Sequence, residues 1–187
     1  QSRLVRVIRI TTETLAGIPS IIYGLFGFLA FVLFMGWSYS LLAGVLTLAI
    51  MVLPTIIRTT EEALLAVPSS YREVSFGLGA GKLRTIFKIV LPAAMPGILS
   101  GIILAIGRIV GETAALIFTS GTSPQAVLGL HDSARTLSVH MYCLLSEGLY
   151  TDQAYATAVV LLVIVAGING LSGTVAGKLS GKGRKER

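Results

Sequence analysis

The sequence predicts an all-α membrane protein with four transmembrane helices. Hydrophobic residues make up 53% of the 187 residues and charged residues only 13%, with a mean hydropathy of +0.82, which is too apolar for an ordinary soluble domain. Residues 14–57 contain no charged side chain, a run about twice as long as one bilayer crossing requires. The cations are also distributed very unevenly along the chain, as a multi-pass membrane protein would require.

Four apolar runs give the predicted spans within one transmembrane domain that covers residues 1–187. They are residues 15–37, 41–57, 93–118 and 154–175. The first two are separated by the turn-prone run 36–40, whose Trp37 and Tyr39 suit the membrane–water interface, so we expect a tight helical hairpin. Pro19 and Pro54 are expected to kink the helices that contain them.

Positive charge predicts the orientation of these spans. Four crossings place the N-terminal segment, the loop 58–92 and the C-terminal tail on one side, and the loop 119–153 on the other. Thirteen of the 15 Lys and Arg residues fall on the first side, whereas the opposite loop holds only Arg135 and the third span holds Arg108. Because cytoplasmic segments carry the excess of Lys and Arg, the first side, with the C-terminus, is predicted to be cytoplasmic.

Composition excludes several other classes of site. The net charge of +6 is explained by orientation, and the sequence has no basic helix with interleaved aromatic residues that would indicate nucleic-acid binding. Cys143 is the only cysteine, so no internal disulfide can form. His131 and His140 have no evident third ligand, so we expect no metal site and read them, with Asp132, as ordinary residues of the outer loop.

The cytoplasmic loop 58–92 has the pattern of short amphipathic helices. Thr59 with Glu62, and Ser70 with Glu73, have the capping-box spacing and predict two helix starts. Pro68 is expected to end the first of these helices. Beyond Gly79 and Gly81 an apolar stripe resumes at helical spacing: Leu83, Ile86, Phe87 and Val90.

A long motif crosses this loop: Glu73-Val74-Ser75, three residues, Gly79, nine residues, Ile89, one residue, and Leu91-Pro92. It resembles the E-A-A-x3-G-x9-I-x-L-P motif of ATP-binding-cassette (ABC) importer permeases, except that the family has two alanines where this chain has Val74 and Ser75. The resemblance implies a loop that docks into a cleft of a separate ATPase subunit. The residues it implies for this coupling are Glu73, Gly79, Ile89, Leu91 and Pro92, and Gly79 would permit a bend between two helices.

The chain lacks a recognisable nucleotide site of its own. Residues 77–85 read G-L-G-A-G-K-L-R-T, but Phe76 stands where a P-loop needs its first glycine, and Leu83 follows the lysine. We therefore expect a transport subunit and not an enzyme, with no cofactor on this chain. ATP and Mg would be used by the partner ATPase.

Arg108 and Glu112 lie near the middle of the third predicted span. An arginine at the bilayer centre costs about 2.5–3.5 kcal/mol on insertion scales, so it should face the protein interior and have a partner. On one continuous helix the spacing of four places Glu112 on the same face as Arg108. Two interpretations stay open: a neutral internal ion pair, or a site where Arg108 offers fork-shaped donors to a passing oxyanion while Glu112 holds the arginine in place.

The residues around this pair carry a second resemblance. Residues 108–114, R-I-V-G-E-T-A, are similar to the R-x-x-G-E-T-A string of permeases of the phosphate-specific importer, and further matches extend from Gly17 to Gly148. Residues 137–148 favour the PstA type over its PstC-type sister. The resemblance implies an anion pathway that includes Arg108, Glu112 and Thr113.

The same resemblance implies an assembly and a location. The partners would be a PstC-type sister permease, a dimer of PstB-type ATPases and an extracytoplasmic PstS-type phosphate-binding protein, in the cytoplasmic (inner) membrane of a bacterium or archaeon. His131, Asp132 and His140 lie where the binding protein would dock. The family usually has six spans, so its first two helices are expected to be missing from this sequence.

Three alternatives remain beside a phosphate permease. A permease for sulfate or molybdate would have much the same coupling loop, and only residues 108–114 and the accompanying matches argue against it. An intramembrane hydrolase lacks support, because no H-E-x-x-H occurs and Ser100 has no histidine partner within a span. A non-transporting scaffold would explain close-packing glycine pairs such as Gly97 with Gly101, but not Arg108 or the coupling motif.

Overall fold

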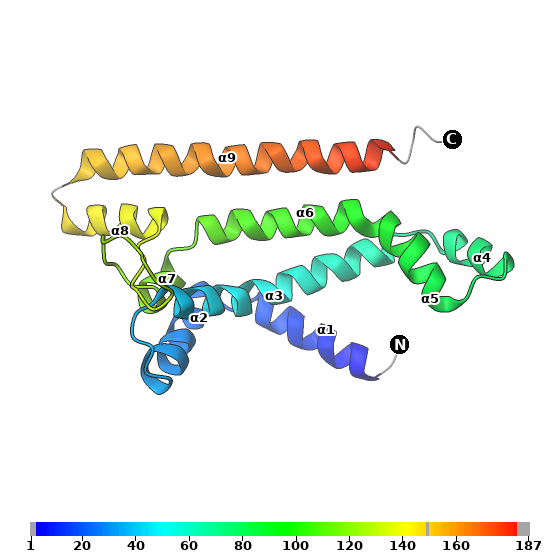
Figure 1. The fold of residues 1–187 in the computed structure, drawn as a ribbon, viewed down its shortest axis with the longest axis horizontal. Helices are drawn as coiled ribbons and strands as arrows, with labels where there is room; N and C mark the ends of the chain where they lie inside the picture. The colour runs from blue at the N-terminus through cyan, green and yellow to red at the C-terminus, as the bar shows by residue number, and fades with distance from the viewer. Residues whose placement is uncertain (1–2, 149, 183–187) are drawn as a thin grey trace.

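The protein is built from helices throughout the part that the structure describes. The computed structural model describes residues 3–148 and 150–182, and all regular elements in those residues are helical (Figure 1). In chain order they are α1 (Arg3–Ala16), α2 (Ser20–Gly27), the π-helical η1 (Phe28–Phe34), α3 (Leu41–Leu65), α4 (Ser69–Gly77), α5 (Lys82–Thr85), the π-helical η2 (Ile86–Val90), α6 (Leu91–Val110), α7 (Ala114–Thr119), α8 (Leu137–Glu147) and α9 (Thr151–Lys182). The predicted all-α fold is confirmed.

The first predicted span, 15–37, is sharply bent and not straight. α1 ends at Ala16, and α2 with η1 lies at 99° to it. Pro19 precedes α2 with φ −58° and ψ 141°, an extended conformation that interrupts the helix. The Tyr23 hydroxyl donates to the carbonyl of Leu15 at 2.7 Å, which ties α2 back to the end of α1. The kink expected at Pro19 is therefore a sharp bend between two separate helices.

The second span is longer than predicted. α3 runs past residue 57 as far as Leu65, and Pro54 lies inside it. Thr59 and Glu62 are consequently interior helix residues, and the Thr59 hydroxyl donates back to the carbonyl of Thr55 at 3.0 Å. The helix start predicted at Thr59 is wrong, because the helix of the second span simply continues through it.

The outer end of α3 is held by the loop that follows α7. The Ser40 side chain accepts from the amide of Ala43 at 3.3 Å, as an N-cap does. The amides of Leu41 and Leu42 donate to the carbonyls of Asp132 and Leu130 at 2.8 and 2.9 Å. The loop thereby satisfies donors that the first turn of a helix leaves free.

The second predicted capping box does not form either. α4 begins at Ser69, directly after Pro68, and no side chain caps its first turn, so Ser70 and Glu73 make no box. Proline supplies the helix start instead, because its fixed φ suits the residue before a first turn and Pro68 has φ −55°. From Lys82 the chain is helical through α5 and η2 into α6.

The most extensive helix pair in the described residues is α3 with α6, and two glycines let these helices pack closely. A Cβ atom on Gly101 would lie 2.7 Å from the Cβ of Thr59, and one on Gly97 would lie 2.8 Å from the Cβ of Ala63, so neither position has room for a side chain. The predicted close packing at this glycine pair is confirmed. Beside it lies the main core cluster: Tyr23, Leu48, Met51, Val52, Ala105, Leu116 and Val139.

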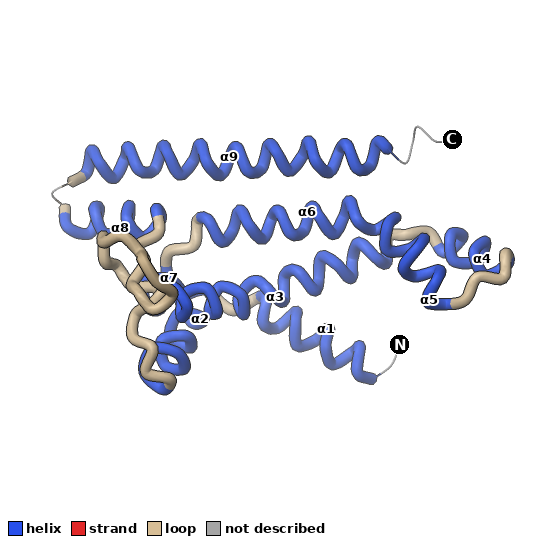
Figure 2. The backbone as a smooth tube through the Cα atoms, viewed as in Figure 1, coloured by secondary structure: helices blue, strands red, loops and turns tan. Residues whose placement is uncertain are grey.

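The long helices separate two ends of the molecule. α4 and α5 lie at one end, toward which α1 begins and α9 ends, whereas α7, α8 and their connecting loop lie at the other (Figure 1). The tube view in Figure 2 shows the loops gathered at these ends. This arrangement agrees with the two sides assigned from charge. The tail cations Arg184, Lys185 and Arg187 lie outside the described residues.

α9 extends beyond the predicted span 154–175 at both ends and packs along α6 and α8. Over residues 151–171 it is strongly apolar, yet only 11% of its most hydrophobic window is buried within the chain. An apolar helix face of this kind contacts lipid or another protein chain.

Candidate functional site

The third predicted span, 93–118, contains a break at the charged pair. α6 ends at Val110 with Arg108 in its last turn, and residues 111–113 separate it from α7. Arg108 and Glu112 therefore do not share the face of one helix, and they form no ion pair with each other within the described chain. The expected spacing argument is wrong because the helix stops before it reaches the glutamate.

The Glu112 side chain instead caps the first turn of the next helix, from the residue before its N-cap position, Thr113. Its carboxylate accepts from the amide of Ala115 at 3.2 Å, its side chain is almost fully buried, and its own carbonyl accepts from the Ser138 hydroxyl at 2.7 Å. A carboxylate at a helix N-terminus is stabilised by the free amides and by the helix dipole. Thr113 lies half-buried at the turn between the two helices. Glu112 thus fixes the backbone that follows Arg108.

Arg108 lines a cavity between three helices. The cavity has a volume of about 360 Å³ and lies among α3, α6 and α9. Its polar side chains are Thr55, Arg108 and Asn169, and the remaining lining is aliphatic or glycine. No carboxylate is within ion-pair distance of Arg108 among the described residues, so its charge is uncompensated there. The geometry suits a small anion held by a guanidinium, an amide and a hydroxyl.

Asn169 and Thr55 are members of this cavity that the sequence argument missed. Asn169 is a polar residue within the apolar run of α9. A polar side chain at such a position is rare, and this is the feature by which the sequence could have identified it. Gly107 faces α9 at this point, since a Cβ atom placed there would be in contact with the Asn169 Oδ1 at 3.4 Å. Thr55 comes from α3, one turn before the predicted cytoplasmic loop.

The coupling motif forms an elbow, residues 69–90, which we call the coupling elbow. Gly79 has φ +78°, a left-handed conformation that side chains disfavour, so the bend expected at this glycine is present. The hydroxyls of Ser75 and Thr85 share a hydrogen bond of 2.8 Å across the bend, and both residues are buried. The Arg72 guanidinium donates to the carbonyl of Leu64 at 3.1 Å, which ties α4 to the end of α3.

The other motif residues lie on either side of this bend. Glu73 is exposed on α4, Ile89 and Leu91 are half-buried, and Pro92 stands in the first turn of α6. Val74, the larger residue in the departure from the family motif, points outward with 63% of its surface exposed. The close packing inside the elbow is made by its small neighbour Ser75 and not by Val74.

The elbow carries a set of exposed apolar side chains at an otherwise charged end of the molecule. They are Val74, Phe76, Leu78, Leu83 and Phe87, each at least half exposed. Large apolar side chains grouped on a solvent-facing segment indicate a protein contact surface. The elbow therefore has both a rigid internal tie and an unburied apolar exterior.

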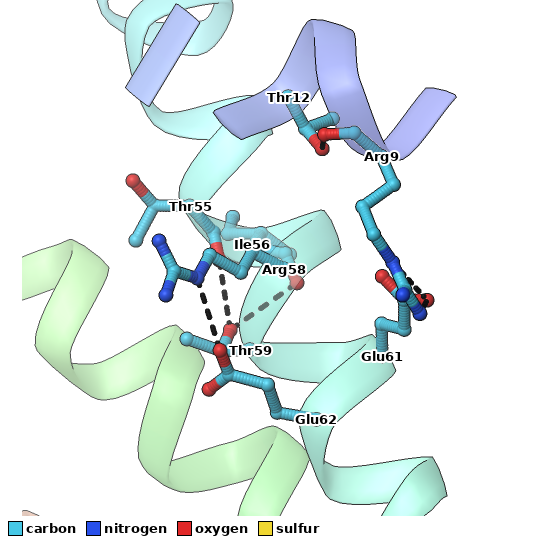
Figure 3. Close-up of polar contacts among 8 residues, drawn as sticks. All are labelled: Arg9, Thr12, Thr55, Ile56, Arg58, Thr59, Glu61 and Glu62. Carbon is cyan, nitrogen blue, oxygen red and sulfur yellow. Dashed lines mark hydrogen bonds and ion pairs between the residues drawn. The ribbon is translucent and has the colours of Figure 1, made fainter. Parts of the chain in front are cut away.

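A second polar cluster joins α1 to α3, and the sequence argument missed it. Arg9 on α1 forms an ion pair with Glu61, and Arg58 pairs with Glu62 at 2.9 Å one helical turn away (Figure 3). These four side chains, with Glu13, line a small cavity of about 180 Å³. The cluster fastens α1 to the C-terminal half of α3.

The outer-loop residues singled out from the sequence are dispersed. His131 packs edge-on against Trp37, with ring centroids 6.4 Å apart, and the Asp132 carboxylate accepts from the amides of Leu128 and Gly129 at 2.9 and 2.8 Å. His140 lies on α8. Over the described ranges 3–148 and 150–182, no three histidine, cysteine or carboxylate side chains are grouped to hold a metal ion.

Known proteins with similar sequences are ABC transporter permeases. The chain is 38% identical over 158 residues to "Probable ABC transporter permease protein YqgI" of Bacillus subtilis, covering 78% of this chain and 54% of that protein. It is 39% identical over 170 residues to "Phosphate transport system permease protein PstA 1" of Mycobacterium tuberculosis, covering 89% and 56%. It is 47% identical over 124 residues to PstA of Yersinia pestis, covering 64% and 40%. The chain thus spans about half the length of the curated relatives it matches.

The fold is also shared with a solved transporter. A chain of the MetNI methionine ABC transporter in an inward-facing conformation superposes with a TM-score of 0.75 and 22% sequence identity, over 95% of this chain and 76% of that one. The resemblance to a PstA-type permease is confirmed by the named relatives. The model of the binding-protein-dependent transport system inner membrane component matches residues 1–174, and the chain belongs to that family.

Proposed function

We propose that the chain is a membrane-spanning permease subunit of an ATP-driven importer that moves inorganic phosphate into the cytoplasm. The observation that carries the proposal is Arg108, which lines a cavity of about 360 Å³ without a carboxylate partner in the described chain. An arginine in a membrane span is costly unless a partner or ligand uses its charge, and Arg108 is exposed on this chain, so an anion can reach it. Relatives named as phosphate permeases supply the choice of anion.

Each polar side chain of the cavity would have a different role in binding the anion. Arg108 supplies positive potential and parallel donors that match two oxygens of phosphate. The Asn169 amide and the Thr55 hydroxyl add neutral donors from the two neighbouring helices. Glu112 acts indirectly, because it caps α7 and fixes the break that follows Arg108, and Thr113 lies at the same break. A few donors of this kind bind an anion weakly enough to release it when the helices move.

The coupling elbow would transmit that movement. Its exposed apolar side chains would dock on a partner ATPase, with Glu73 at the same surface, and Ile89, Leu91 and Pro92 would connect the bend at Gly79 to α6. ATP and Mg would be bound by that ATPase and not by this chain. We assign the sister permease, ATPase dimer and extracytoplasmic binding protein to the PstC, PstB and PstS types from the named relatives.

The proposed orientation places the elbow and the C-terminal tail in the cytoplasm. Thirteen cations belong to the N-terminal segment, the coupling loop and the tail, and only Arg135 belongs to the opposite loop. α4 and α5 lie at the end toward which α1 begins and α9 ends (Figure 1). The positive-inside rule then places the elbow and the tail in the cytoplasm, and the family supplies the location of this multi-pass protein in a bacterial or archaeal inner membrane.

Uptake of labelled anions tests the cargo. Cells that lack their high-affinity phosphate permease would receive the chain in full with its partner subunits, and phosphate, sulfate and molybdate would be compared. ATP-dependent uptake of phosphate alone is expected, and Arg108→Gln should abolish it while Arg3→Gln, an exposed cation on α1, leaves it unchanged. Sulfate or molybdate uptake without phosphate would reassign the cargo, and normal phosphate uptake by Arg108→Gln would reject the anion role.

A further inference from the structure

The outer loop contains a second cavity with an unpaired arginine. It has a volume of about 300 Å³ and is lined by Pro124, Gln125, Val127, Ala134, Arg135, Thr136, Leu137 and His140. Its lining includes no acidic residue. The one arginine of the outer loop therefore lies in the same hollow as a histidine, an amide and a hydroxyl.

Among the residues that the structure describes, the Arg135 side chain has no ion-pair partner, and its Nε has no hydrogen-bond partner. This Nε atom is buried. The nearby acid, Asp132, is already occupied by the amides of Leu128 and Gly129. A buried donor left unsatisfied costs about 1–3 kcal/mol, and more for a charged group, so a shift of this side chain that brought Nε to an anion in the cavity would recover that energy.

The backbone around Arg135 is held rigidly. The amide and carbonyl of Ala134 bond to Ser120, the amide donating to the Ser120 carbonyl at 3.0 Å and the carbonyl accepting from its hydroxyl at 2.6 Å. Thr136 then caps α8, accepting from the amide of Val139 at 3.4 Å. The cavity consequently lies at the positive end of an 11-residue helix as well as beside an arginine.

A short chain of contacts links this cavity to the inner one. Ser138, two residues beyond the cap of α8, donates to the carbonyl of Glu112 at 2.7 Å, and Glu112 fixes the break after Arg108. Each cavity has one arginine without a carboxylate partner in the described residues. The two cavities are thus connected through the hydrogen bonds of Ser138 and Glu112.

We propose that the outer cavity is an oxyanion-binding site that takes a tetrahedral anion such as inorganic phosphate on Arg135 before it reaches Arg108. Arg135 provides the charge and the fork of donors, and Gln125, Thr136 and His140 provide the remaining polar groups. That an anion binds in the outer cavity does not depend on the import function. That it binds there before it reaches Arg108 rests on the proposed function.

Protection of an introduced cysteine tests the site in the assembled transporter, reconstituted in lipid nanodiscs. Cys143→Ser removes the native thiol, and Val127→Cys then places a thiol on the cavity lining. Leu128→Cys, whose native side chain is 93% exposed and outside the lining, is the matched control. A water-soluble thiol reagent is applied in phosphate, sulfate or chloride at equal ionic strength, and labelling of this chain is measured after the subunits are separated.

The expected result is slower labelling of Val127→Cys in phosphate, by about tenfold at ten times the dissociation constant, with no change at Leu128→Cys. Arg135→Gln should remove the protection and Arg135→Lys should keep most of it. Equal labelling in phosphate and chloride, or equal slowing at Leu128→Cys, would overturn the site. Protection by sulfate alone would support an oxyanion site but exclude phosphate as its ligand.

The inner site provides the comparison that separates this inference from the proposed function. Arg108→Gln should lose phosphate uptake and still show phosphate protection at Val127→Cys. Loss of protection in Arg108→Gln would show that the outer cavity binds no anion independently. Retained uptake in Arg108→Gln, together with retained protection, would reject the proposed role of the inner cavity and leave the outer site standing.

Discussion

Ser75 and Thr85 lie on opposite arms of the coupling elbow, and their buried hydroxyls share a hydrogen bond of 2.8 Å. Ser75 stands where the family motif has an alanine, so this chain has a hydroxyl at a position where alanine offers none. The Thr85 hydroxyl has a second partner, the carbonyl of Gly81 at 3.2 Å, whereas the described contacts give Ser75 no other. The two ends of the bond are therefore unequal.

This inequality predicts an order among three variants. Thr85→Val should leave the Ser75 hydroxyl buried and unsatisfied, which costs about 1–3 kcal/mol. Ser75→Ala should cost less, because Thr85 keeps the Gly81 carbonyl. The double variant should be more stable than Thr85→Val alone, since it leaves no hydroxyl without a partner. The midpoint of thermal inactivation of the complex's ATPase activity would measure this order, and a double variant weaker than both single variants would contradict it.

Gly79 should be the most sensitive position of the elbow to any side chain. Its φ of +78° costs an L-residue about 1–2 kcal/mol, and proline, which also removes the amide that donates to Phe76 at 2.9 Å, cannot adopt it. Gly79→Pro should abolish transport-coupled ATPase activity and weaken co-purification of the ATPase. Gly77→Ala is the control, because Gly77 ends α4 with open space around it. Equal activity in Gly79→Pro and Gly77→Ala would reject the elbow's role.

The ion pair of Arg9 with Glu61 should stabilise the contact between α1 and α3 modestly (Figure 3). Both side chains are about one-third exposed, so solvent screening keeps the contribution of the pair small. Arg9→Glu should lower the thermal midpoint more than Arg9→Gln, because it places a third carboxylate beside Glu13 and Glu61. The exchange Arg9→Glu with Glu61→Arg should recover part of the loss; no recovery would show that the pair itself contributes nothing.

The sequence predicts the helical membrane fold because apolar runs of sufficient length have few alternatives in a bilayer. It does not predict where the runs break. The bend at Pro19 depends on Tyr23 bonding back to Leu15, and the break after Arg108 depends on Glu112 capping α7. Both are tertiary or capping contacts that a hydropathy pattern does not contain.

The residues of the candidate sites, too, are only partly predictable from the sequence. Arg108 is visible in the sequence because a charge in a span is rare, and the elbow is visible because its motif is long. The partners of these residues are not visible. Thr55 and Asn169 reach the Arg108 cavity from two other helices, and Ser75 meets Thr85 across a bend whose angle the motif does not specify.

Asn169 provides the sharpest test of the inner cavity. Asn169→Asp would place a carboxylate beside Arg108, where it would compete with phosphate for the guanidinium and repel the anion. Phosphate uptake should then be lost as completely as in Arg108→Gln. Asn169→Ala removes one neutral hydrogen bond, which is worth about 0.5–1.5 kcal/mol, and should therefore lower uptake only several-fold. Because the aspartate and alanine variants both remove the amide, the difference between them measures the effect of a negative charge placed beside Arg108. Equal uptake by the two variants would show that Arg108 does not bind the transported anion in this cavity.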